Sequence, residues 1–177
     1  MAQVLASIVA KAFPAHEVAL FEGALATSQA LLAMPFDHIF FTGSPAVGKV
    51  VMAAAAKNLT SVTLELGGKS PTIVDETADL QKAAETIMWG KFVNAGQTCV
   101  APDYLYVHAS VRDAFVAACQ AVIKARYGDS AQSQRSNADF THIINQRHTQ
   151  RIEGLLKDAT SRGARVLSGG EVDTAGN

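Results

Sequence analysis

Two cysteines occur in this chain of 177 residues, and their surroundings differ. Cys119 lies in a segment where apolar residues recur at three- and four-residue steps, as on one face of an amphipathic helix, so we expect it to pack in a core. Cys99 lies in VNAGQTCVAPDY (residues 93–104), where glycine, proline and polar residues favour a loop. A loop thiol is a candidate nucleophile, although burial as a small apolar side chain is the commoner role of a cysteine.

A carboxylate precedes a glycine pair in the stretch TLELGGKSP (residues 63–71). Glu65 stands near the end of a segment that alternates like a strand, directly before Leu66, Gly67 and Gly68. We expect Glu65 to be partly buried there. Burial disfavours the charged form of a carboxyl, and such a carboxyl can accept a proton from water as a general base. The alternative is a local capping or pairing role, which is more frequent at strand ends.

A glycine turn joins an apolar strand to a helix in FFTGSPAVGKVV (residues 40–51). Gly43 and Gly48 give the spacing Gly-x-x-x-x-Gly, and the helix opens within it. Unpaired N–H groups and the positive end of the helix dipole can bind a phosphate at such a turn. A tight turn also needs glycine when nothing binds, so both interpretations remain open.

A P-loop is the main competing interpretation of these glycines, and the sequence argues against it. Val50 follows Gly48 and Lys49, where a P-loop has the serine or threonine that binds Mg²⁺. The later Gly-Lys-Ser at residues 68–70 would need glycine at the position of Thr63. An ATPase is therefore not expected.

Helical and strand patterns alternate along the chain, which predicts an α/β fold with a largely parallel sheet. A short apolar run at residues 18–23 follows the first helix, and residues 128–140 are expected to form an exposed loop. The expected helices cover residues 1–13, 28–34, 46–58, 79–93, 111–128 and 147–163, and the expected strands cover residues 37–43, 61–68, 70–75 and 103–109.

Composition indicates a globular protein with a small-molecule partner. The chain is 49% hydrophobic and 18% charged, and its formal net charge of −1 gives no basic footprint for nucleic acid. The five histidines show no ligand spacing, so no metal site is expected. We find no Cys-x-x-Cys pair, basic leader or long apolar span, which predicts a reducing, cytoplasmic location without a membrane partner.

The three motifs FFTGSPAVGK, LELGGKSP and NAGQTCVAPDY together resemble the NAD(P)-dependent aldehyde dehydrogenase superfamily. The chain is most similar to the class 3 branch, which includes fatty-aldehyde, aromatic-aldehyde and bacterial coniferyl aldehyde dehydrogenases. This resemblance implies a parallel-sheet, Rossmann-like cofactor domain, of which residues 1–66 form the second part. It also implies that residues 67–177 form the first part of an α/β catalytic domain.

The resemblance implies a covalent mechanism. Cys99 attacks the aldehyde carbon to give a thiohemiacetal, and hydride transfer to the nicotinamide leaves a thioester. A water activated by Glu65 then hydrolyses the thioester. The backbone N–H of Cys99 would help to hold the oxyanion.

The same resemblance implies NAD or NADP as cofactor. The pyrophosphate would lie against Gly43, Ser44 and Gly48. Thr42 would lie beside the nicotinamide end, which Leu66 and Gly67 would approach through their backbone.

Three motifs of the superfamily are absent from this sequence: Lys-Pro-Ser-Glu, the upstream asparagine of the oxyanion hole and Glu-x-Phe-Gly-Pro. We therefore expect a central fragment that is weakly active or inactive alone, from an enzyme that is a homo-oligomer at full length. Two alternatives remain, a truncated remnant that serves as an association module and a cysteine acyltransferase or esterase. The motifs do not specify the aldehyde or choose between NAD and NADP.

Overall fold

The computed structural model describes residues 1–173, and the chain divides into two compact units, Met1–Gly67 and the part from Gly68 onward. Each unit contains one pair of parallel strands with helices against it, so the fold is α/β as the sequence predicts. The assignment of a cofactor role to residues 1–66 and of a catalytic role to residues 67–177 stays a prediction.

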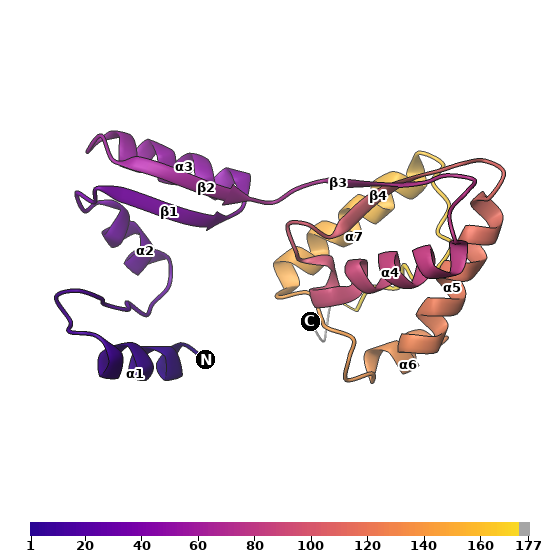
Figure 1. Cartoon of the computed structure of the whole chain (residues 1–177), viewed down its shortest axis with the longest axis horizontal. Coiled ribbons are helices and arrows are strands. Elements are labelled where there is room, and N and C mark those ends of the chain that lie inside the picture. The colour runs from indigo at the N-terminus through magenta and orange to yellow at the C-terminus, as the bar shows by residue number, and fades with distance from the viewer. Residues whose placement is uncertain (174–177) are drawn as a thin grey trace. The chain divides into compact units, whose positions relative to one another are not determined.

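The first unit is built around a β–α–β arrangement in which α3 covers one face of a two-stranded sheet (Figure 1). Strands β1 and β2 run in parallel, and their register pairs Thr42 with Glu65 and Gly43 with Leu66. The elements of this unit are α1 (Ala2–Ala12), α2 (Leu25–Leu32), β1 (His38–Gly43), α3 (Pro45–Ala56) and β2 (Ser61–Leu66).

Local sequence explains where α3 begins and which face it buries. The Ser44 side chain caps the helix by accepting a hydrogen bond from the Val47 N–H at 3.3 Å, and Pro45 occupies the first helical position, where its missing N–H costs nothing. The buried residues of the helix, Gly48, Val51 and Ala55, recur at three- and four-residue steps. They form the one face that packs on the sheet.

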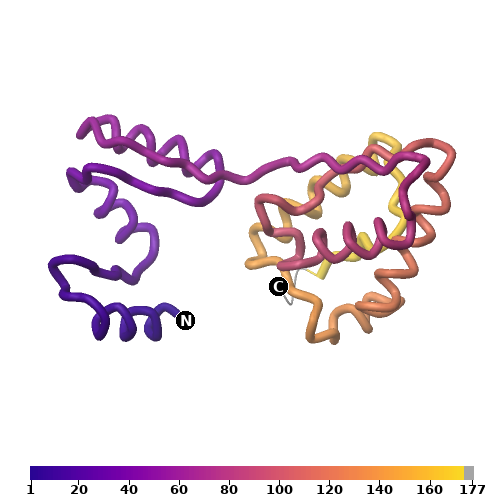
Figure 2. The backbone as a smooth tube through the Cα atoms, viewed as in Figure 1, coloured from indigo at the N-terminus to yellow at the C-terminus, as the bar shows by residue number. Residues whose placement is uncertain are grey.

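The second unit contains the larger core, and Figure 2 traces its chain from the strands through α5 and back along α7. Strands β3 and β4 pair in parallel with an irregularity between Ser70 and Pro71. Its elements are β3 (Ser70–Val74), α4 (Leu80–Phe92), the 3₁₀ helix η1 (Val93–Gly96), β4 (Pro102–Val107), α5 (Arg112–Tyr127), α6 (Ala131–Arg135) and α7 (Gln146–Ser161).

The core of the second unit joins β3, α4 and α5 through one buried cluster. Cys119 is half-buried and packs against this cluster, so its predicted core position is confirmed. Burial raises the pKa of the Cys119 thiol, because a desolvated thiolate is disfavoured. The buried residues of the cluster are Val74, Ala84, Ile87, Phe115 and Val122.

Two sequence-based expectations need correction. The predicted loop at residues 128–140 contains the short helix α6, because Ser130 and Ser133 form a reciprocal capping box that satisfies the backbone at its start. The predicted helix at 28–34 begins earlier, at Leu25, and ends at Leu32. Among the described residues, no helix is long and apolar enough to cross a membrane.

Candidate active site

The carboxyl ends of β1 and β2 gather most of the predicted cofactor residues at one edge of the sheet. In a parallel pair the carboxyl ends meet, and the register places Thr42 beside Glu65. The chain leaving β1 enters α3 through Ser44, while the chain leaving β2 continues into Gly67. The predicted residues at this edge are Thr42, Gly43, Ser44, Glu65, Leu66 and Gly67.

Gly48 sets how closely α3 approaches β2. It is buried, and a Cβ atom at this position would lie 2.9 Å from Cδ2 of Leu66 and 3.6 Å from Cδ1 of Leu64. Any side chain here would require Leu66 or α3 to move, so glycine favours this close packing, whatever binds at the turn. The close approach keeps the start of α3 near the end of β2.

The edge fits the diphosphate part of a dinucleotide. The start of a three-turn helix supplies N–H groups and the positive end of its dipole, and Ser44 fixes the point where the helix begins. A Cβ atom at Gly67 would meet nothing within 4 Å, so space is open beside the end of β2. Gly43, Ser44 and Gly67 could hold a cofactor here.

Glu65 is exposed, so the expectation of partial burial is wrong. Leu64 and Leu66 face α3, and successive side chains of a strand point to opposite faces, so Glu65 lies on the other face. Phe40, on that same face, is 67% exposed. Solvent reaches the Glu65 carboxylate because no helix of the first unit covers this side of the sheet near it.

Cys99 lies on a tight turn in the second unit, and its side chain is exposed. The Ala101 N–H donates to the Thr98 carbonyl at 3.1 Å, which places Cys99 and Val100 at the two central positions of the turn. Cys99 therefore lies in a loop, as the sequence predicts. We call residues 93–101 the thiol loop.

Gly68 allows a close approach to the thiol loop that sequence analysis missed. A Cβ atom at Gly68 would lie 2.8 Å from the carbonyl oxygen of Cys99, which is shorter than a carbon and an oxygen tolerate. The second glycine of the Gly-Gly pair is therefore needed where the two backbones meet. The Gly67–Gly68 pair is the feature of the sequence that could have indicated this close approach.

Ion pairs connect the two ends of the thiol loop. Asp103, just after the loop, pairs with Lys91 of α4 at 3.7 Å and with Lys69 at 3.3 Å. The Asp103 side chain is 29% exposed, Lys91 is 38% exposed and Lys69 is 81% exposed, so solvent screens the pair with Lys91 less than the pair with Lys69. Sequence analysis did not single out these three residues, although two charges flanking a loop were a visible signal.

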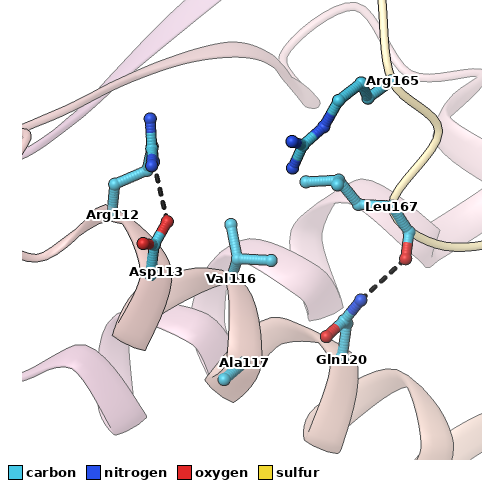
Figure 3. A pocket seen from close by; sticks show the side chains of 7 residues that line it. All are labelled: Arg112, Asp113, Val116, Ala117, Gln120, Arg165 and Leu167. Carbon is cyan, nitrogen blue, oxygen red and sulfur yellow. Dashed lines mark hydrogen bonds and ion pairs between the residues drawn. The ribbon is translucent and has the colours of Figure 1, made fainter.

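A groove of the second unit lies elsewhere, between α5 and residues 165–167 (Figure 3). Its volume is about 510 Å³, and none of the predicted site residues lines it. Arg112 donates to Asp113 at 2.8 Å, and this hydrogen bond lowers the pKa of the Asp113 carboxyl. Gln120 donates to the Leu167 carbonyl at 2.7 Å, which fixes the extended segment over α5.

The fold, the glycine turn and the loop thiol agree with the family to which the sequence belongs. The model of the aldehyde dehydrogenase family matches residues 1–177, so the chain belongs to that family. A rat protein, the dimeric NADP-preferring aldehyde dehydrogenase, is 47% identical over 88% of the chain and 34% of its own length. Mouse aldehyde dehydrogenase family 3 member A2 is 42% identical over 98% of the chain and 34% of its own length.

A solved structure shows the same fold. The aldehyde dehydrogenase of Mycobacterium tuberculosis complexed with NAD⁺ superposes with a TM-score of 0.85 and 33% identity. The match covers 98% of this chain and 36% of that protein. The chain thus spans about a third of the length of the relatives that it matches.

Proposed function

We propose that this chain supplies the nucleophile and part of the cofactor site of an NAD(P)-dependent enzyme that oxidises an aldehyde to a carboxylic acid. The observation that carries the proposal is the exposed Cys99 thiol at the centre of a turn, in a family of aldehyde dehydrogenases. An exposed thiol can reach a carbonyl carbon, whereas a structural cysteine such as Cys119 is packed away.

Cys99 acts first in the proposed mechanism. Its sulfur forms a bond to the aldehyde carbon, and the carbonyl oxygen becomes the oxyanion of a thiohemiacetal. A backbone N–H at the turn stabilises that oxyanion. Loss of hydride from the same carbon converts the adduct into a thioester, which is an oxidation by two electrons.

Glu65 acts in the second half of the reaction. Its carboxylate takes a proton from water, the hydroxide attacks the thioester carbon, and the Cys99 sulfur leaves. The products are the carboxylic acid and the Cys99 thiolate, and the enzyme is regenerated when Glu65 releases its proton to water. Exposure of Glu65 supports access to water.

The cofactor would lie against the edge formed by the carboxyl ends of β1 and β2. Gly43, Ser44 and Gly48 would hold its pyrophosphate at the start of α3, while Thr42, Leu66 and Gly67 would approach its nicotinamide end. NAD or NADP, when bound, supplies the hydride acceptor. The structure of a relative with NAD⁺ and the name of a relative that prefers NADP support this cofactor class without choosing within it.

Trapping the thioester tests the proposal directly. Glu65→Gln retains the shape of the side chain but cannot take a proton, so we expect hydrolysis to fail. The variant is incubated with benzaldehyde and NAD⁺ or NADP⁺, and mass spectrometry of its peptides is then expected to find a benzoyl group on Cys99. Because one turnover suffices, the assay works even if the chain alone is as weakly active as the sequence suggests.

Matched variants control this experiment. Glu22→Gln, at another exposed carboxylate of the first unit, should behave as the unsubstituted chain and accumulate no adduct. Cys99→Ala should abolish the label. A label that forms equally without cofactor from an activated ester, with none from the aldehyde, would favour the acyltransferase or esterase alternative.

An association role is the other alternative, and the sheet faces favour it. Phe40 in the first unit is 67% exposed, while Ile73 and Tyr106 in the second are 76% and 64% exposed. Apolar faces of this kind promote association. For the full-length protein we propose a homo-oligomer, and sedimentation velocity of this chain measures whether it self-associates in the absence of aldehyde and cofactor.

A further inference from the structure

Gln97 uses its side-chain amide to join the thiol loop to the segment that leads into α7. Its Oε1 accepts from the Ile144 N–H at 3.0 Å, and its Nε2 donates to the His142 carbonyl at 3.2 Å. These partners are 47 and 45 residues away in the sequence. A glutamine amide has two donor hydrogens and one acceptor oxygen, which makes such two-way pairing possible.

The same side chain also closes the thiol loop on itself. Nε2 of Gln97 donates to the Asn94 carbonyl at 2.9 Å, and Nδ2 of Asn94 donates back to the Gln97 carbonyl at 3.1 Å. The Gln97 N–H donates to the Asn94 carbonyl as well, at 3.0 Å. Asn94 and Gln97 are therefore joined by reciprocal hydrogen bonds, and Gln97 lies two residues before Cys99.

These hydrogen bonds hold a backbone that would otherwise relax. Asn94 and Ala95 have φ values of 53° each, and Gly96 follows at 73°. The left-handed region is unfavourable for a non-glycine residue, and Ala95 has no side-chain polar group to compensate. Such a conformation persists only where surrounding contacts determine it.

We propose that Gln97 is the positioning residue of the nucleophile: its amide fixes the strained turn at residues 94–96 and docks it on residues 142–144, and this places Cys99. The inference rests on the proposed role of Cys99. It goes beyond that role by assigning the loop's geometry to one side chain. The Gln97 amide acts on Cys99 through the backbone and is not itself assigned a contact with substrate.

Hydrogen–deuterium exchange tests the docking. Gln97→Met keeps a side chain of similar length but removes the amide. In this variant we expect exchange of the Ile144 and Ala101 amide hydrogens to accelerate by about fivefold or more, because the Ile144 N–H loses its acceptor and the turn that contains Ala101 is no longer docked. Gln81→Met is the matched control, because Gln81 bonds only within α4, to Glu85. It should leave both amides unchanged.

Alkylation by iodoacetamide tests the effect on the thiol. Peptide mapping separates Cys99 from Cys119 in one sample, and a synthetic peptide of residues 93–104 gives the rate of the same thiol without a fold. The rate constant of Cys99 in the chain is expected to differ from that of the peptide by about threefold or more, because the microenvironment controls thiol reactivity. In Gln97→Met it should move to the peptide value.

Cys119 distinguishes positioning from unfolding, because it packs against the core. Positioning predicts an unchanged Cys119 rate in Gln97→Met. If both cysteines react faster there and also in the more conservative Gln97→Glu, Gln97 supports the whole unit and the proposal is wrong. It is also wrong if Cys99 already reacts like the peptide or ignores the substitution.

Neither measurement uses aldehyde or cofactor. A failure of thioester trapping would thus refute the proposed function and leave the docking result intact. Conversely, a benzoyl label on Cys99 that forms as fast in the double variant Glu65→Gln/Gln97→Met as in Glu65→Gln would refute the positioning role alone.

Discussion

The two units position their candidate site residues by different means. In the first unit, backbone geometry positions the residues: a parallel register pairs Thr42 with Glu65, and Gly48 lets α3 approach β2. In the second unit, side chains fix the thiol loop through long-range hydrogen bonds and ion pairs of Gln97 and Asp103. The comparison indicates that the candidate cofactor edge forms from local chain geometry, whereas the loop that holds the candidate nucleophile depends on contacts with distant residues.

The units also differ in their cores. The buried apolar residues of the first unit are Val51 and Ala55, whereas a cluster of five residues anchors the second. Apolar burial contributes about 25 cal/mol per Å², so the second unit should be the more stable part of the chain. This difference can be tested one unit at a time.

Phe115→Ala should have the largest effect. Phe115 is 3% exposed in the core of the second unit, and truncating such a side chain costs about 3–5 kcal/mol. Trp89 is the only tryptophan in the chain and lies in α4, so its fluorescence follows urea unfolding of the second unit. We expect a large drop in the urea midpoint.

Val51→Ala is the partner of that substitution in the first unit. Val51 is 2% exposed, and its truncation should cost about 1–3 kcal/mol, detected as faster amide exchange in β1 and β2. If the units are independent, the Trp89 midpoint stays where it is in the unsubstituted chain. A lowered midpoint would mean that the two units unfold together, and it would contradict the conclusion that their stabilities differ independently.

Gly48→Ala should have an intermediate effect and test the backbone mechanism. The new methyl group would lie 2.9 Å from Cδ2 of Leu66, so either the Leu66 side chain or α3 must move. We expect this repacking to cost about 1–3 kcal/mol, offset in part by the higher helix propensity of alanine, about 1 kcal/mol. Amide exchange in α3 reports the loss. Gly154→Ala is the control, because a Cβ atom there meets nothing within 4 Å in α7 and alanine favours a helix by about 1 kcal/mol. An α3 as protected in Gly48→Ala as in the original chain would contradict close packing as the role of this glycine.

Sequence patterns predict the strands and the longer helices of both units, for a physical reason. The alternation of β2, the Ser44 cap and the glycine turn are local signals, and they lead to the strands and helix that form the edge. The burial of Glu65 was mispredicted because exposure depends on what covers the sheet, which no local pattern encodes. The loop position made Cys99 a candidate nucleophile, and the family resemblance favoured that role over burial.

The thiol loop shows the limit of local patterns most clearly. The loop itself was predictable from its glycine and proline, but the partners of Gln97 lie 45 and 47 residues away. A single sequence contains no period or spacing that links such distant residues. The roles of Cys99, Glu65 and the cofactor residues remain predictions that the trapping experiment tests.

Asp103→Asn should have a small, salt-dependent effect on the second unit. It weakens the ion pairs with Lys69 and Lys91, and a partly exposed pair is worth about 1 kcal/mol or less. The Trp89 midpoint should fall slightly at low salt and less at high salt, because ions screen the pairs. Asp158→Asn, which breaks the pair with Arg162 in α7, is the exposed control. An equal response of the two variants would mean that the Asp103 pairs add nothing specific to the loop.

Asp75 should give the smallest effect, and its sign follows from its hydrogen bonds. The Thr77 hydroxyl donates to its carboxylate at 2.7 Å and the Thr77 N–H at 2.8 Å, and these bonds lower the pKa of Asp75. A carboxyl with a pKa lower in the folded than in the unfolded state stabilises the fold fully above its unfolded value, about 3.9. That contribution is lost as the pH falls through the folded pKa.

Thr77→Ala removes the hydroxyl donor, so the fall of the Trp89 midpoint between pH 5 and acid pH should become slightly shallower than in the original chain. Ser110→Ala serves as a control, since its hydroxyl bonds His108 rather than Asp75. An unchanged acid slope in Thr77→Ala would show that the Thr77 hydroxyl adds nothing to the stability that Asp75 provides. In that case this side-chain hydrogen bond would not count toward the contrast between the two units.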